Sequence, residues 1–187
     1  MGVNGSRVDE LVERVRAGER VSFLFFWGHR PQRDGSVGRG CLSQWWISPF
    51  VVDGLTFPSA EHFMMWRKAT LFGDEESAER ILHAPDPPRA KALGRGVRGF
   101  DHSRWEDARY QIVLDGSLAK FDQHPDLRRF LLDTGDQVLV EASPEDRVWG
   151  IGLRAEDPRA GDPAQWLGQN LLGFALTEAR SILAERG

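Results

Sequence analysis

Residues 49–72 read PFVVDGLTFPSAEHFMMWRKATLF and decide most of the fold. Two apolar triplets, 50–52 and 55–57, flank Asp53-Gly54, a pair typical of the type I′ turn of a β-hairpin. Ser59 can then cap a helix that runs from Ala60 to about Phe72. Because this helix is apolar on nearly every side, we expect it to be buried. The stretch predicts a hairpin that leads directly into a core helix.

Outward from this stretch, the patterns predict a mainly helical α+β protein. A small sheet and the hairpin are expected to pack against several helices. We expect residues 1–21 to carry an N-terminal packing helix and residues 22–187 to form the single main domain. Further helices are predicted at 6–19, 74–84, 87–95, 101–122, 125–133 and 170–185, and strands at 20–27 and 137–142.

Composition excludes several classes of protein. The chain has 187 residues, 41% of them hydrophobic, which suits one globular domain. Its net charge of −4 gives no global attraction to nucleic acid or lipid. Cys41 is the single cysteine, the histidines lack metal-ligand spacing, and no glycine-rich nucleotide motif occurs. We therefore expect a cytoplasmic protein with no metal, no cofactor and no membrane partner. A monomer is compatible with this composition.

Lysine is scarce in this chain, and its placement is informative. Only three of the 24 basic residues are lysines, at positions 68, 91 and 120. Glu61 and Lys68 are seven residues apart and so share one helix face, about 10 Å from each other. A buried lysine has a lowered pKa, and its neutral amine is a nucleophile. The alternative is a solvated face with two charges too distant to pair.

Two other stretches carry candidate functional groups. Residues 141–152 place an acid, a base and an indole after a predicted strand, with Asp146 as a candidate acid and Trp149 as a stacking surface. The alternative there is an Asp-Arg turn beside a core tryptophan. Residues 89–98 carry four bases and no acid, which suits a phosphate; the commoner alternative is a plain exposed helix face.

Ten blocks of sequence follow one another in the order of a known family. They are FFWGH at 25–29, CLSQWWISPF at 41–50, the Asp53-Gly54 hairpin, PSAEHFMM at 58–65, KA at 68–69, LGR at 93–95, KF at 120–121, VEASP at 140–144, DR at 146–147 and WGIG at 149–152. In this order the chain resembles the NADAR (YbiA-like) family over about residues 22–184. The resemblance implies a YbiA-like fold and hydrolysis of N-glycosidic bonds.

The resemblance also assigns roles to individual residues. Lys68 matches the family's lysine and would form a transient Schiff base with an opened ribose. Glu61 would shuttle protons, with Asp146 as a second candidate. The residues expected to bind substrate are Phe26, Trp27, Gly28, His29, Ser43, Gln44, Trp45, Trp46, Arg95, Trp105, Arg147, Trp149, Gly150 and Asn170.

Three functions are consistent with this resemblance. The first is a hydrolase that removes ADP-ribose from guanine, with ADP-ribosylated nucleic acid among its partners. The second is a hydrolase of ribosylamino-pyrimidine phosphates, which are riboflavin-biosynthesis intermediates. The third is a reader that binds ADP-ribose without turnover, which the presence of both Glu61 and Lys68 disfavours. The long segment 25–40 favours the larger ligand, ADP-ribose.

Overall fold

The computed structural model describes residues 6–186, so positions 1–5 and 187 of the two expected segments lie outside the described residues. The described part is mainly helical, as predicted, with short strands that form two small sheets. The helices are α1 (Ser6–Arg16), α2 (Ala60–Leu71), α3 (Glu75–Leu82), α4 (Pro87–Arg95), α5 (His102–Gln123), α6 (Pro125–Asp133) and α7 (Leu171–Glu185), with short 3-10 turns η1 (Arg39–Leu42) and η2 (Pro163–Gln165). The strands are β1 (Phe23–Phe26), β2 (Phe50–Val52), β3 (Leu55–Phe57) and β4 (Val138–Glu141).

The predicted hairpin and the helix that follows it are confirmed. Strands β2 and β3 pair antiparallel, and Asp53 and Gly54 have φ angles of +50° and +78°, as a type I′ turn requires. The Ser59 hydroxyl caps α2 by accepting a hydrogen bond from the His62 backbone N–H. The ring of Phe57 packs against Phe63 of α2 with 5.1 Å between centroids, which fixes the hairpin on the helix.

The small parallel sheet determines where the functional residues meet. Strands β1 and β4 pair in parallel with Phe26 opposite Glu141. The carboxyl ends of both strands therefore lie at the same edge, where ligands commonly bind in α/β proteins. Strand β1 begins at Phe23 rather than Arg20, and α1 ends at Arg16 rather than Glu19. Gly18, with φ of +84°, ends the first helix early.

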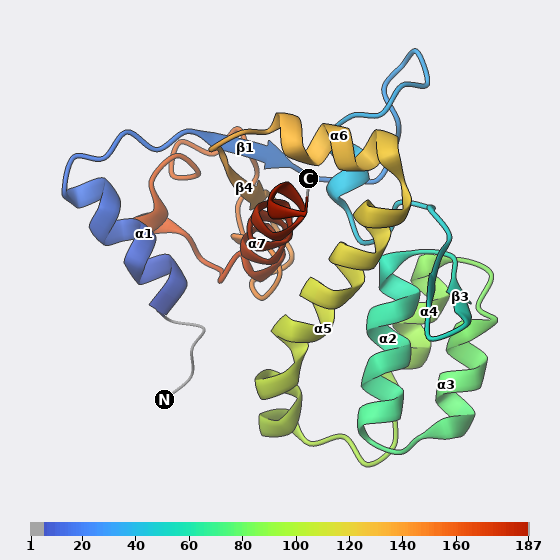
Figure 1. Cartoon of the computed structure of the whole chain (residues 1–187). Helices are drawn as coiled ribbons and strands as arrows, with labels where there is room; N and C mark the ends of the chain where they lie inside the picture. Colours follow the sequence, from blue (N-terminus) through green and yellow to red (C-terminus); the bar gives the residue numbers. More distant parts are fainter. Residues whose placement is uncertain (1–5, 187) are drawn as a thin grey trace.

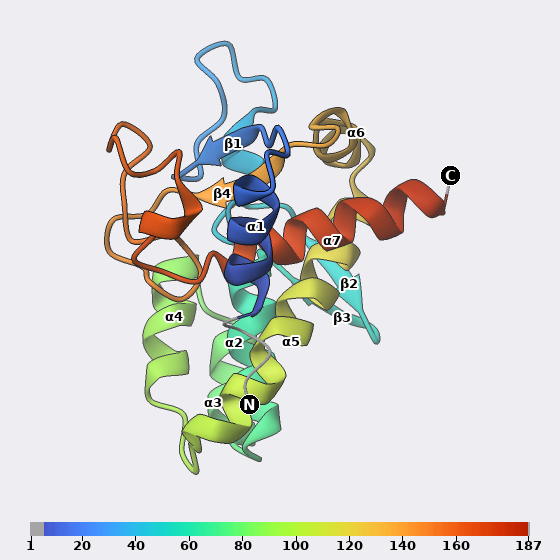
Figure 2. The same cartoon turned by 90° about the vertical axis from the view of Figure 1, so that its left-hand side faces the viewer.

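Helix α5 runs through the middle of the molecule (Figures 1 and 2). It packs against α2 on one side and α7 on the other, and α3 and α4 cover α2. A second, smaller apolar cluster joins Leu11 of α1 to Val138, Val140 and Ile151 beside the parallel strands. Within residues 6–186, every helix is too short or too polar to cross a membrane.

Candidate active site

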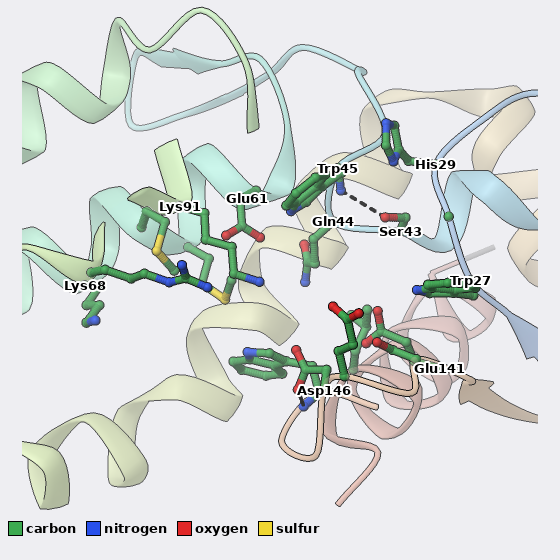
Figure 3. Close-up of a pocket in the computed structure, with 18 of the residues that line it drawn as sticks. Trp27, His29, Ser43, Gln44, Trp45, Glu61, Lys68, Lys91, Glu141 and Asp146 are labelled. Atoms are coloured by element: carbon green, nitrogen blue, oxygen red, sulfur yellow. Dashed lines mark hydrogen bonds between the residues drawn. The ribbon is translucent and has the colours of Figure 1, made fainter. Parts of the chain in front are cut away.

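A cavity of about 560 Å³ opens at the carboxyl ends of β1 and β4. Its size is within the range of about 300–1,000 Å³ that small-molecule sites occupy. Figure 3 shows Lys68 and Trp27 at opposite ends of this cavity. The wall consists of Trp27, Gly28, His29, Ser43, Gln44, Trp45, Glu61, Met64, Met65, Lys68, Lys91, Arg95, Trp105, Glu141, Ser143, Glu145, Asp146, Trp149 and Leu172.

Helix α2 supplies one wall of the cavity. Glu61, Met64, Met65 and Lys68 all line it, which is the face expected from a spacing of three, four and seven residues. The helix is buried over most of its length, as predicted. The Glu61 backbone N–H donates to the Gln44 carbonyl at 2.9 Å, so the first turn of α2 is tied to the segment that carries the aromatic rim.

Glu61 is a buried carboxyl with one unpaired oxygen. The residue is 3% exposed, and its Oε1 atom has no hydrogen-bond partner among the described residues. Burial raises the pKa of Glu61 to about 7, and the positive charge of Lys91 on α4 opposes part of that rise. A carboxyl with a pKa near neutrality can both give and take a proton.

Lys68 lies at the other end of the same helix face. Its Nζ donates to the Gly94 carbonyl at 2.8 Å and lies 4.4 Å from the Phe100 ring centroid and 5.5 Å from that of Trp105. Burial lowers the pKa of this amine. The close packing of α4 on α2 depends on this glycine, because a Cβ at position 94 would clash with Sδ and Cγ of Met65.

The turn after β4 supplies the opposite wall. Asp146 Oδ1 accepts hydrogen bonds from the backbone N–H groups of Val148 and Trp149, at 2.9 and 2.8 Å. This carboxylate therefore fixes the turn that presents the Trp149 indole to the cavity. The predicted Asp turn is present, and both Asp146 and Trp149 face the cavity as well.

Comparison with known proteins agrees with this geometry. The NADAR domain matches residues 25–184. The chain belongs to the NADAR family. It is 38% identical to N-glycosidase R617 of Acanthamoeba polyphaga mimivirus over 167 residues, which cover 87% of this chain and 96% of that protein. It is 34% identical to N-glycosidase YbiA of Escherichia coli over 145 residues, or 78% of this chain and 82% of that protein.

The fold of this NADAR chain is similar to that of a solved relative. The NMR structure of E. coli YbiA superposes with a TM-score of 0.70 and 30% sequence identity, covering 89% of this chain and 88% of that one. The predicted YbiA-like fold is therefore confirmed. The two named relatives are N-glycosidases, which are hydrolases of N-glycosyl bonds.

Most residues predicted for the NADAR site meet at the cavity. All three proposed catalytic residues line it, together with the rim from Trp27 to His29, the segment from Ser43 to Trp45, Arg95, Trp105 and Trp149. In the rim, the His29 and Trp45 rings lie 5.6 Å apart, and the Trp45 backbone N–H donates to the Ser43 hydroxyl (Figure 3). Residues 30–40 are absent from the wall, so the length of that segment gives no support for a larger ligand.

Five predicted binding residues lie outside the cavity wall, and each has another role. Phe26 is a buried strand residue, which faces away from Trp27 because side chains alternate along a strand. Trp46 packs against the main core, and Gly150 places its backbone against the Glu141 carbonyl. Arg147 is exposed, and its backbone carbonyl accepts a hydrogen bond from the Gln169 backbone N–H.

Asn170, the fifth of these residues, supports the free edge of β4. Its Oδ1 accepts from the Glu141 backbone N–H at 3.0 Å, and its Nδ2 donates to the Leu139 carbonyl at 2.9 Å. It adopts a left-handed conformation with φ of +51°, which asparagine tolerates better than most residues. Asn170 therefore positions the strand end that carries Glu141.

The basic run at 89–98 divides between two roles. Lys91 and Arg95 line the cavity. Arg98 instead binds Asp74 at 2.6 Å and Glu76 at 3.0 Å, so it joins α3 to the segment after α4. Arg89 is exposed and lies outside the wall.

The structure also brings to the site residues for which the sequence predicted no role. Lys91, one of the three lysines, and Glu141 and Ser143, in the candidate stretch 141–152, line the cavity although the sequence predicts no role for them. Lys120 is 1% exposed, and its ammonium group donates to the Cys41 and Ser43 carbonyls at 2.6 and 2.9 Å. It therefore holds the segment that leads to Trp45, although it does not line the cavity.

Proposed function

We propose that this protein is an N-glycosidase that removes ADP-ribose from guanine, by cleaving the bond between ribose C1 and the exocyclic amine of the base. The reaction class is that of the relatives, which are named N-glycosidases. The observation that carries the proposal is that a buried carboxyl, Glu61, and a partly buried amine, Lys68, line one cavity between aromatic side chains.

The chemistry follows from the nature of the bond. Protonation of the ribose ring oxygen breaks its bond to C1 and leaves an imine between C1 and the base nitrogen. The neutral amine of Lys68 adds to C1, and the base leaves after its nitrogen receives a proton. Water then adds to the Schiff base, a carboxylate takes a proton, and the C1–Nζ bond breaks to free Lys68 and the sugar.

The surroundings of Lys68 support its role as the nucleophile. Burial favours the neutral amine, and the hydrogen bond to the Gly94 carbonyl fixes its direction. Glu61 supports proton transfer, because burial brings its pKa close to neutrality. Asp146 is less suited to this task, since its Oδ1 already accepts two backbone hydrogen bonds.

The rest of the wall suits a ligand with flat rings and phosphates. Four indoles, of Trp27, Trp45, Trp105 and Trp149, offer stacking surfaces, and Lys91 and Arg95 offer positive charge. ADP-ribose on guanine has two bases and a diphosphate, whereas a ribosylamino-pyrimidine phosphate has one ring and one phosphate. The number of aromatic surfaces favours the larger substrate.

The proposal is tested by offering the protein both substrates. We expect base release from ADP-ribosylated guanosine, followed by mass spectrometry, to exceed release from a ribosylamino-pyrimidine phosphate. Binding of ADP-ribose with no release of either base would identify a reader instead. Faster release from the pyrimidine substrate would assign the protein to the second function.

The Schiff base is tested separately by borohydride reduction during turnover. We expect a covalent sugar adduct that peptide mapping locates on Lys68, and we expect Lys68→Arg to lose both the adduct and turnover. An adduct on Lys91 or Lys120, or full turnover by Lys68→Arg, would rule out Lys68 as the nucleophile.

A further inference from the structure

Glu141 is held in the cavity wall by a rigid backbone. It is the last residue of β4, opposite Phe26 of β1. Its N–H donates to Asn170 Oδ1 at 3.0 Å, and its carbonyl accepts from the Ile151 N–H at 2.9 Å. Its side chain lines the cavity, and its Oε2 is buried without a hydrogen-bond partner among the described residues. A fixed carboxyl with an unpaired buried oxygen is suited to act on a ligand.

The charged groups around the cavity distinguish the two buried carboxyls. Glu141 is near the carboxylate of Asp146, in the turn that follows it, and faces Glu61 from α2 and Lys91 from α4. Burial raises the pKa of Glu141 to about 8, and Asp146 adds to the rise. For Glu61 the largest charge effect is that of Lys91, which lowers the pKa; Trp45 and Arg95 also lower it, and Asp146 raises it. The largest charge effect on each carboxyl therefore favours the protonated form of Glu141 and the ionised form of Glu61.

Asp146 is another carboxyl that could act on a ligand, because it lines the same wall. Its Oδ1, however, accepts both the Val148 and the Trp149 backbone N–H groups. That oxygen is thus already engaged in holding the turn, whereas Oε2 of Glu141 has no partner among the described residues. Asp146 therefore supports the turn, and its charge raises the pKa of the neighbouring Glu141.

We propose that Glu141 is the general acid that protonates the leaving amine of the base, while Glu61 is the base that deprotonates water. The inference rests on the proposed N-glycosidase function. In the first step the C1–N bond breaks, and the base nitrogen takes the Glu141 proton. In the second step water adds to the Schiff base at C1 and gives a proton to Glu61. Transfer of that proton to Glu141, directly or through solvent, restores the starting state.

The test compares two leaving groups that differ in their need for protonation. ADP-ribosyl guanosine has a poor leaving amine, whereas ADP-ribosyl 4-nitroaniline releases a weakly basic amine that departs with little help. For Glu141→Gln we expect kcat on the guanosine substrate to fall about 100-fold or more, with KM nearly unchanged. On the nitroaniline substrate we expect less than a tenfold loss. A purely structural role would lower both rates equally.

Two further variants keep the test decisive. Glu10→Gln makes the same chemical change at an exposed position on α1 and is expected to leave both rates unchanged. If Glu141→Gln folds poorly, Glu141→Ala with added formate replaces it, and rescue of the guanosine rate is expected. Equal losses on both substrates, or none, would overturn the role of Glu141. Failure of the unaltered protein to release either amine would instead refute the proposed function.

Discussion

Replacing Glu61 with glutamine tests the central claim that the cavity holds a buried, proton-exchanging carboxyl. The side chains are nearly isosteric, so the fold and the affinity for ADP-ribose are expected to persist. Turnover is expected to fall by roughly 10²–10⁴, the range typical of a lost general acid or base. Isothermal titration with ADP-ribose and a base-release assay measure the two quantities separately.

The same substitution has a predictable effect on stability. The pKa of Glu61 rises from 4.5 to about 7 on folding. At about 1.4 kcal/mol per pKa unit, the folded state disfavours the ionised carboxyl by about 3 kcal/mol. The folded pKa lies above the unfolded one, so folding is favoured by the protonated carboxyl. This contribution to stability, about 3 kcal/mol, is fully present below about pH 4.5 and is lost as pH rises through about 7.

Glutamine cannot ionise, so the Glu61→Gln protein escapes that loss. We expect its free energy of unfolding, measured in urea, to differ little from that of the unaltered protein at about pH 4 and to exceed it by up to about 3 kcal/mol at about pH 8.5. The exposed Glu10→Gln variant should show no such change with pH. Equal differences at both pH values would refute the buried-carboxyl reasoning, and unchanged turnover would refute the catalytic role.

Two further substitutions probe ligand binding and the support of the strand end. Arg95→Ala should raise KM with a modest effect on kcat, as expected when an interaction made equally in the ground state and the transition state is lost. The control Arg89→Ala, at an exposed position, should change neither constant. Identical kinetics for the two variants would contradict a ligand-binding role for Arg95. Asn170→Ala should destabilise the protein by about 3 kcal/mol in thermal or urea unfolding, because it leaves two backbone groups of β4 unpaired. Asn170→Asp keeps the acceptor for the Glu141 N–H, so its loss of stability should be smaller.

Local chemistry made much of the fold predictable from the sequence. Asp53-Gly54 needs positive φ angles that few other pairs adopt, and Ser59 and Asp101 cap helices through contacts only three residues away. The Glu61–Lys68 face is likewise a matter of helical periodicity. Such signals act over a few residues, so they can be read without knowledge of the tertiary structure.

The opposite wall of the cavity depends on contacts that no local pattern encodes. Glu141 reaches the site because β4 pairs with β1 from more than a hundred residues away, in a register that places it opposite Phe26. The same register turns Phe26 into the core and leaves Trp27 at the rim, although the two are adjacent in sequence. Lys91 reaches the cavity because α4 packs closely against α2, and this close packing depends on Gly94.

The scarcity of lysine has a practical consequence for chemical labelling. Two of the three lysines line the cavity, and the third, Lys120, is 1% exposed and lies outside the wall. A reagent that acylates primary amines thus meets, apart from the terminal amine, only Lys68 and Lys91 as accessible side-chain targets. With Lys68 as the proposed nucleophile, acylation is expected to abolish turnover, and protection of those two amines by a bound ligand would report occupancy without any measurement of turnover.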